Sequence, residues 1–416
     1  ARLPRLVRRP RGPRPEPCAA VIRRLRDYYR QFEELSQEEI SAELRTRRDA
    51  ERASALAQVP ALDLSTPAWH EPPDAEAVNA ATYALRRAVN SYPDDGPLRE
   101  AIGARHGVDV ERVAPGHGAG ELLHAAFRAI GVGDGRVAVA WPGWGPLPRL
   151  VHEAGGVPVP VPLTAAGAAD SHALAEADAA AVVLCTPNDP TGAAVPAADL
   201  HRLAERLPDD VWLIVDAALA DFQGGSDPLT ARRGPEGGQT PPGISRPRAE
   251  PPPRTGSDPQ QGLTPLAARE RVLVVRSFSK AHAMAGFRAG YALANDEELV
   301  DRLTPAGGVS APAQAAMLWA VQEGDALVAR RRAAAARERD RLRDALRGTP
   351  FSFPAGHGHL AWLSSTEHDG ATIARGLAAQ RIYVAPGTAW GDDRHVRVAL
   401  RDGAATDRLA AALSDL

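Results

Sequence analysis

From about residue 75 onward, the chain alternates between short runs that are apolar throughout and longer segments with helical periodicity. The apolar runs are VAVAW (137–141), AAVVLC (180–185), VWLIVD (211–216) and RVLVVRS (271–277), and the helical segments between them include ELLHAAFRAI (121–130) and PAADLHRLAERL (196–207). Strands that are apolar on both faces and separated by helices are typical of a parallel sheet covered on both sides. The pattern therefore predicts an α/β fold in which a mostly parallel sheet is sandwiched by helices.

The C-terminal part of the chain has a different pattern. A long helix is predicted over 311–347, and it is followed by the strand-like runs HLAWLS (359–364), RIYVA (381–385) and HVRVAL (395–400). These elements predict a smaller α+β domain. We expect residues 96–305 to form the large domain, and residues 61–95 and 306–416 to form the N-terminal and C-terminal parts of the small domain.

Two segments do not follow either pattern. Residues 1–60 are an N-terminal extension, in which a basic arm predicted to be disordered precedes predicted helices at 19–34 and 37–58. Residues 224–265 contain ten prolines and eight glycines and have almost no apolar periodicity, which predicts a disordered or irregular insertion. Because this insertion separates two predicted strands of one sheet, we expect it to loop out from the body.

Composition and charge exclude several classes of protein. The 416 residues are 44% hydrophobic, which is enough for a large core. A formal net charge of −3 fits neither a globally basic nucleic-acid binder nor a strongly acidic disordered chain. Two cysteines, Cys18 and Cys185, cannot build a disulfide framework, and no run approaches the roughly 20 apolar residues of a membrane helix. We therefore expect a cytoplasmic protein that binds neither nucleic acid nor membranes.

Lys280 is the single lysine among the 49 lysine and arginine side chains. Arginine replaces lysine as a surface cation, but its guanidinium stays protonated and cannot form an imine with an aldehyde. Lys280 lies in SFSKAHAMAGFRAGY (277–291), directly after a predicted buried strand, with Ser277, Ser279 and Arg288 close by. An amine, two hydroxyls and a guanidinium suit a phosphorylated aldehyde. A lone lysine can be an accident of composition, but its place beside these groups favours the functional interpretation.

Asp216 ends another predicted buried strand, where a carboxylate needs a partner. A protonated pyridine nitrogen is one candidate partner, and the N-terminus of a helix is the other.

Three further motifs are suggestive only in combination. In CTPNDPTG (185–192), Asn188 is placed to donate to a phenolate oxygen, although a turn needs no such function. GHGAGELL (116–123) opens a helix with glycines, which offers free N–H groups to a phosphate. Trp144 follows a predicted strand and can stack on a flat ring, although core packing is the ordinary role of a tryptophan.

In this order, the motifs resemble those of the class I/II aminotransferases, pyridoxal-phosphate enzymes with the aspartate-aminotransferase fold, known as fold type I. The resemblance runs from about Leu64 to the end, apart from the insertion. It implies that the large domain binds pyridoxal 5'-phosphate and that Lys280 holds this cofactor covalently and later moves a proton. Asp216 would pair with the ring nitrogen, Asn188 would donate to the ring hydroxyl, and Trp144 would stack on the ring. The implied phosphate ligands are the backbone N–H groups of Ala119 and Gly120 and the side chains of Ser277, Ser279 and Arg288.

The resemblance also implies contacts at both ends of the chain. SYPDDGPLREAI (91–102) is similar to the family segment whose tyrosine, here Tyr92, reaches the phosphate of the neighbouring subunit, so a homodimer is expected. HVRVAL is similar to the family strand whose arginine, here Arg397, binds the substrate α-carboxylate. A surface cation is the alternative interpretation of Arg397, which its apolar neighbours disfavour.

Two positions depart from the family pattern. Leu219 replaces the usual tyrosine of Asp-x-Ala-Tyr, which donates to the ring oxygen. Ala385 stands where histidinol-phosphate aminotransferases tend to carry an arginine for the substrate phosphate.

The sequence therefore predicts a homodimeric aminotransferase that moves an amino group between an α-amino acid and a 2-oxo acid, without a metal. The same residues also serve histidinol-phosphate transamination, α-decarboxylation, and β-elimination as in a C–S lyase. A ligand-sensing regulator fused to DNA-binding helices is an alternative of another class. The acidic segment FEELSQEEISAEL is a poor fit to a DNA backbone.

Overall fold

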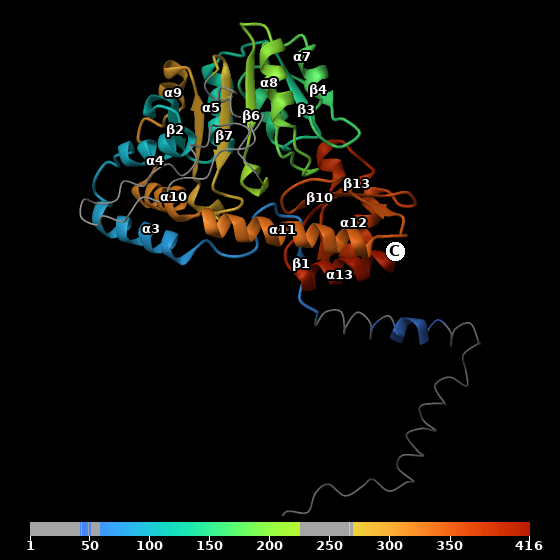
Figure 1. The fold of residues 1–416 in the computed structure, drawn as a ribbon. Coiled ribbons are helices and arrows are strands. Elements are labelled where there is room, and N and C mark those ends of the chain that lie inside the picture. Colours follow the sequence, from blue (N-terminus) through green and yellow to red (C-terminus); the bar gives the residue numbers. More distant parts are fainter. Residues whose placement is uncertain (1–41, 43, 49, 51–58, 225–265, 267–268) are drawn as a thin grey trace, which may run out of the picture. The chain divides into compact units, whose positions relative to one another are not determined.

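The computed structural model describes residues 42, 44–48, 50, 59–224, 266 and 269–416 (Figure 1). The chain divides into two units, residues 1–60 and 61–416. In the first unit, residues 42, 44–48 and 50 are helical and fall within the helix predicted at 37–58. The predicted basic arm, the predicted helix at 19–34 and almost all of the predicted insertion at 224–265 lie outside the described residues.

The second unit is built on a seven-stranded sheet with the strand order β2-β8-β7-β6-β5-β3-β4 (Figure 1). β8 is antiparallel to both of its neighbours, and the other neighbouring pairs are parallel. The strands are β2 (Val113–Gly116), β3 (Arg136–Trp141), β4 (Val157–Pro162), β5 (Ala181–Cys185), β6 (Trp212–Asp216), β7 (Val272–Ser277) and β8 (Gly290–Ala294). The mostly parallel sheet predicted from the apolar runs is confirmed.

The four predicted strands are β3, β5, β6 and β7, whereas the pattern did not reveal β2, β4 and β8. β4 contains Pro158, Pro160 and Pro162, which interrupt its apolar run. It is an edge strand, and the N–H of Val157 donates to Gly135 O on the side of β3. Because the prolines alternate with the residues that face β3, their missing N–H groups cost no bond within the sheet.

Helices cover both faces of the sheet. The side chains of a central strand point alternately to the two faces, and on each face they belong to a separate apolar cluster. In β5, Val182 and Leu184 join the cluster under one set of helices, while Ala181 and Val183 join the other cluster. The first set is α3 (Ala75–Ala88), α4 (Gly96–His106), α7 (Ser171–Ala175), α8 (Ala197–Arg206) and α10 (Ala311–Glu323). The second set is α5 (Ala119–Ala129), α6 (Leu147–Glu153) and α9 (Glu297–Leu303).

A smaller α+β region follows the sheet domain, as expected. Its four-stranded antiparallel sheet has the order β12-β13-β10-β9, and β1 pairs with β11. The strands are β1 (Leu62–Asp63), β9 (Phe351–Ser352), β10 (Leu360–Ser365), β11 (Ile382–Tyr383), β12 (Ala385–Pro386) and β13 (His395–Ala399). They pack with α11 (Asp325–Ala345), α12 (Gly370–Ala379) and α13 (Gly403–Ser414).

The apolar clusters divide at positions other than the predicted domain boundaries. α3 and α10 were expected in the small domain, but Ala77, Ala81, Met317 and Ala320 belong to the cluster of the large sheet. The cluster of the small region contains residues of β1 and then resumes at Leu342. Periodicity shows that a helix has an apolar face, but it does not show which surface that face will contact.

The helix predicted over 311–347 is two helices, α10 and α11, separated by Gly324. A Cβ atom at Gly324 would collide with the carbonyl oxygen of Ala320, so the break between the two helices falls where a side chain would not fit. α11 has 21 residues, and its exposed face is rich in arginine. Neither α11 nor any other helix within the described ranges is long and apolar enough to cross a membrane.

Candidate active site

Three neighbouring strands of the large sheet end at one cavity. β5, β6 and β7 are mutually parallel, and they end at Cys185, Asp216 and Ser277. The carboxyl ends of parallel strands are the usual ligand-binding edge of such sheets. The cavity has a volume of about 260 Å³, and its lining residues include Pro67, Ala119, Gly120, Trp144, Cys185, Asp189, Asp216, Leu219, Ser277, Ser279, Lys280 and Arg288.

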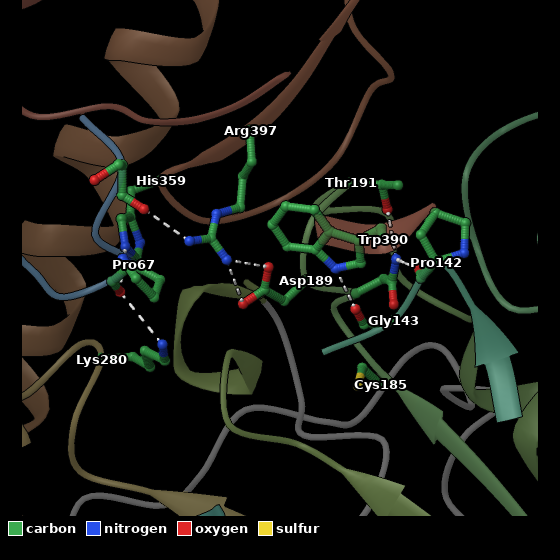
Figure 2. A network of polar contacts seen from close by, with 12 residues as sticks. Pro67, Pro142, Gly143, Cys185, Asp189, Thr191, Lys280, His359, Trp390 and Arg397 are labelled. Carbon is green, nitrogen blue, oxygen red and sulfur yellow. Dashed lines mark hydrogen bonds and ion pairs between the residues drawn. The ribbon is translucent and has the colours of Figure 1, made fainter. Parts of the chain in front are cut away.

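Lys280 follows β7 and directs its amine into this cavity. Its Nζ donates to the carbonyl oxygen of Pro67 at 3.3 Å (Figure 2). Burial lowers the pKa of the Lys280 amine, and the nearby Asp189 carboxylate opposes this shift. The amine therefore loses its proton more readily than an exposed lysine, as a nucleophile must.

Asp216 is 5% exposed and lies at the end of β6. Its Oδ1 accepts from the N–H of Ala218 at 3.0 Å, and its Oδ2 lies 3.6 Å from Cys185 Sγ. Burial raises the pKa of this carboxyl to about 6. A buried carboxylate of this kind is stabilised by a cation placed in the cavity, which favours the predicted ring-nitrogen partner over a helix N-cap.

The N-terminus of α5 and the Arg288 side chain form a second end of the cavity. Gly118 precedes α5 with φ of +92°, and a Cβ atom there would lie 2.8 Å from an Nη of Arg288. A Cβ atom at Gly120 would lie 2.8 Å from the Trp144 ring. The first N–H groups of a helix have no partner within it, so this end offers N–H groups and a guanidinium to an anion.

Arg397 does not line the cavity, and its guanidinium already has partners. Nη1 lies 3.0 Å from Asp189 Oδ1 (Figure 2). Nη2 donates to the carbonyl oxygen of Ser65 at 2.7 Å. The ring of Trp390 lies 5.0 Å from the Arg397 Cζ. Asp189 is the member of this pair that reaches the cavity wall.

Asn188 lies behind the cavity wall, and its predicted contact with the ring hydroxyl stays a prediction. Its Nδ2 donates to the carbonyl oxygen of Pro142 at 3.0 Å and to Thr191 Oγ1 at 3.2 Å. Both N–H bonds of the amide are thereby used, the side chain is fully buried, and it does not line the cavity. The next residue, Asp189, faces the cavity instead, because consecutive side chains on this loop point to different sides.

Tyr92 is 96% exposed and lies away from the cavity within the single chain described. Its predicted contact with a neighbouring subunit stays a prediction. Leu219 lines the cavity, as the match around Asp216 implied, and it brings no hydroxyl group.

Sequence reasoning missed Asp189 and His359. Asp189 lines the cavity and stands in the motif that was singled out for its neighbour Asn188, so the sequence signal lay one position away. His359 Nε2 lies 3.0 Å from the same Pro67 oxygen that accepts from Lys280. Burial lowers the pKa of His359 to about 3, so this ring is neutral. No sequence pattern pointed to it.

Comparison with known proteins agrees with this geometry. The model of the family "Aminotransferase class I and II" matches residues 63–413. The chain belongs to this family. An aromatic amino acid aminotransferase of Rhodococcus jostii (strain RHA1) is 31% identical over 331 residues, which cover 78% of this chain and 81% of the relative. A histidinol-phosphate aminotransferase of Rubrobacter xylanophilus is 32% identical over 303 residues, covering 71% and 76% of the two chains.

Solved structures of aminotransferases share the fold. A mutant aspartate aminotransferase of Thermus thermophilus superposes with a TM-score of 0.69 at 24% identity, over 86% of this chain and 96% of that one. A histidinol-phosphate aminotransferase of Sinorhizobium meliloti in complex with pyridoxal 5'-phosphate gives 0.68 at 21% identity, over 87% and 93%. At these identities the likeness concerns the fold alone, which is fold type I.

The residues of this aminotransferase fit its cofactor, pyridoxal 5'-phosphate. Lys280 provides an amine that can react with the aldehyde of the cofactor, and Asp216 provides a buried carboxylate that can pair with its ring nitrogen. It also has a cradle for the phosphate at Gly118 and Gly120, where added Cβ atoms would meet Arg288 and Trp144. Within the described ranges, no cluster of three or more His, Cys, Asp or Glu side chains could hold a metal ion.

Replacing Gly118 with alanine should weaken cofactor binding by about tenfold or more, because the new methyl group would displace Arg288 and strain a left-handed backbone. The measurement is the dissociation constant of pyridoxal 5'-phosphate, from titration of the cofactor-free protein. Gly131→Ala is a matched control, since Gly131 also has a positive φ of 66° but has no neighbouring atom within 4 Å. Equal losses in the two variants would mean that strain, and not the cradle, explains the effect.

Proposed function

We propose that this pyridoxal-phosphate-dependent aminotransferase of the class I and II family moves an amino group between an α-amino acid and a 2-oxo acid, and that it works as a homodimer to which Tyr92 contributes across the interface. The observation that carries the proposal is the pairing of Lys280 and Asp216 in one cavity beside an anion cradle. A cytoplasmic location is proposed on the sequence alone.

The cofactor supplies an aldehyde that takes up the amino group and a ring that accepts electrons from the reacting carbon. The residues of the chain do the remaining work. Lys280 holds the cofactor, and its freed amine then takes a proton from the reacting carbon of the substrate and returns it. Asp216 keeps a proton on the ring nitrogen. Arg288, Ser277, Ser279 and the start of α5 hold the phosphate, and Trp144 covers one side of the cavity.

An aromatic amino acid is the first donor to test, because the relatives named aromatic amino acid aminotransferases cover most of this chain. A phosphorylated substrate has less support. Ala385 in β12 pairs with Arg397 in β13 and brings no charge to the site.

A screen of amino donors and oxo acceptors tests the proposal. The purified enzyme, loaded with cofactor, is incubated with one amino acid and one 2-oxo acid, and both products are measured by chromatography. We expect a new amino acid and a new oxo acid in equal amounts. Release of carbon dioxide or ammonia without a new amino acid would overturn the proposal in favour of decarboxylation or elimination.

A further inference from the structure

We propose that Asp189 is a specificity-determining residue that cancels the charge of Arg397, so that the site also accepts primary amines as amino donors. Such donors, R–CH2–NH2, carry no carboxylate on the reacting carbon. The inference rests on the proposed function and deepens it by naming a donor class.

The ion pair between Asp189 and Arg397 is built into the fold. Asp189 is on the loop after β5 and Arg397 is on β13, and the two side chains are 6% and 10% exposed. Their nitrogen and oxygen atoms lie 3.0 Å apart, and Figure 2 shows the guanidinium directed at the carboxylate. A pair held at this distance and this degree of burial stays formed, because separating it would leave a charge buried without its partner.

The other bonds of Arg397 reinforce this arrangement. Nη2 donates to Ser65 O, and the Trp390 ring covers the guanidinium. Nε is buried and has no hydrogen-bond partner in the described structure. A substrate carboxylate that approached Arg397 would therefore meet a guanidinium whose positive charge is already balanced by Asp189.

The remaining charges of the cavity are engaged by the cofactor. Arg288 belongs to the phosphate cradle, Asp216 to the ring nitrogen, and Lys280 to the aldehyde. His359 lies beside Pro67 and is neutral, because burial lowers the pKa of its ring to about 3. The substrate side of the site thus has little net charge with which to select a carboxylate, and a carboxylate adds little to donor binding.

The reaction of an amine balances in the same way as that of an amino acid. The donor R–CH2–NH2 loses its amino group and one hydrogen from the same carbon, water supplies the oxygen, and R–CHO leaves. The oxo acceptor gains the amino group and a hydrogen and releases water. The donor carbon is oxidised by two electrons and the acceptor carbon is reduced by two.

The test compares donors that differ only in the carboxylate. Phenylalanine and 2-phenylethylamine form one pair, and alanine and ethylamine form a second pair for a narrow site. Each donor is mixed with the cofactor-loaded enzyme without an acceptor, and the change in cofactor absorbance gives the rate. We expect the amine of at least one pair to react within about tenfold of its amino acid.

The variant Asp189→Asn keeps an oxygen that accepts from Arg397 but removes the negative charge. It should shift the preference toward the amino acid by about tenfold or more. A binding measurement tests the same shift in preference without turnover. Calorimetry gives the affinities of 3-phenylpropionate and of 3-phenylpropan-1-ol, which has the same carbon skeleton but no charge. The variant should bind the carboxylate about tenfold more tightly and the alcohol equally well. Asp199→Asn, at a half-buried site on α8 that does not line the cavity, is the control for loss of one charge from an ion pair with an arginine.

The outcomes are distinguishable. Amino acids that react while both amines stay inert would overturn this inference and leave the proposed function intact. An Asp189→Asn variant with unchanged carboxylate affinity would also overturn it. If the variant does not fold, the wild-type rates decide by themselves. If neither the amino acids nor the amines change the cofactor absorbance, both the proposed function and this inference are overturned.

Discussion

Turnover is expected to fall by more than about 10³-fold when Lys280 is replaced with arginine. The guanidinium keeps a positive charge at nearly the same position, but it cannot form a covalent link with the cofactor or give up a proton at neutral pH. In the wild type, burial lowers the pKa of the amine, so Lys280 is prepared for both tasks. The loss should therefore be in the chemical step, with the fold preserved.

Borohydride reduction followed by peptide mapping locates the covalent link. Because Lys280 is the single lysine of the sequence, we expect the cofactor on the peptide that contains it. Circular dichroism of Lys280→Arg checks that the variant is folded. Cofactor fixed on another peptide, or an arginine variant with full turnover, would contradict the assignment.

Replacing Asp216 with asparagine is expected to increase the stability of the cofactor-free protein and to slow turnover by about 10²–10³-fold. The pKa of this carboxyl is raised by burial from 3.8 to about 6. Its contribution to folding is therefore fully present below pH 3.8 and is lost as the pH rises through about 6. Asparagine avoids the burial of this charge, and its oxygen still accepts from the N–H of Ala218.

The pH dependence makes this prediction specific. At pH 8, the free energy of unfolding of the cofactor-free variant should exceed that of the wild type by about 1–3 kcal/mol, and the difference should be smaller at pH 5. Urea unfolding at both pH values measures the difference, and turnover of the loaded enzyme measures the loss of activity. A variant that is less stable at pH 8 than the wild type would mean that the carboxylate is stabilised by a partner other than the cofactor.

The motifs at the strand ends were predictable because the sequence places each of them directly after an apolar run. Asp216 follows β6, and Ser277 and Lys280 follow β7, so a parallel sheet brings them to one edge whatever the details of packing. The start of α5 follows the same logic, since glycines before a helix leave its N–H groups accessible. Within a loop, the sequence does not show which of two adjacent side chains faces the cavity, and here Asp189 lines it while Asn188 does not.

The sequence by itself determined the fold class, the central strands β3, β5, β6 and β7, and eight of the predicted site residues that line the cavity. These features depend on local periodicity and on strand order. Tertiary structure decided the partner of Arg397, which lies 208 residues from Asp189 in the chain, and the contacts of Lys280 and His359 with Pro67. It also decided that α3 and α10 pack on the large sheet. The apolar pattern of one segment shows which of its side chains are buried. Which side chains they contact depends on how segments that are distant in the sequence pack together.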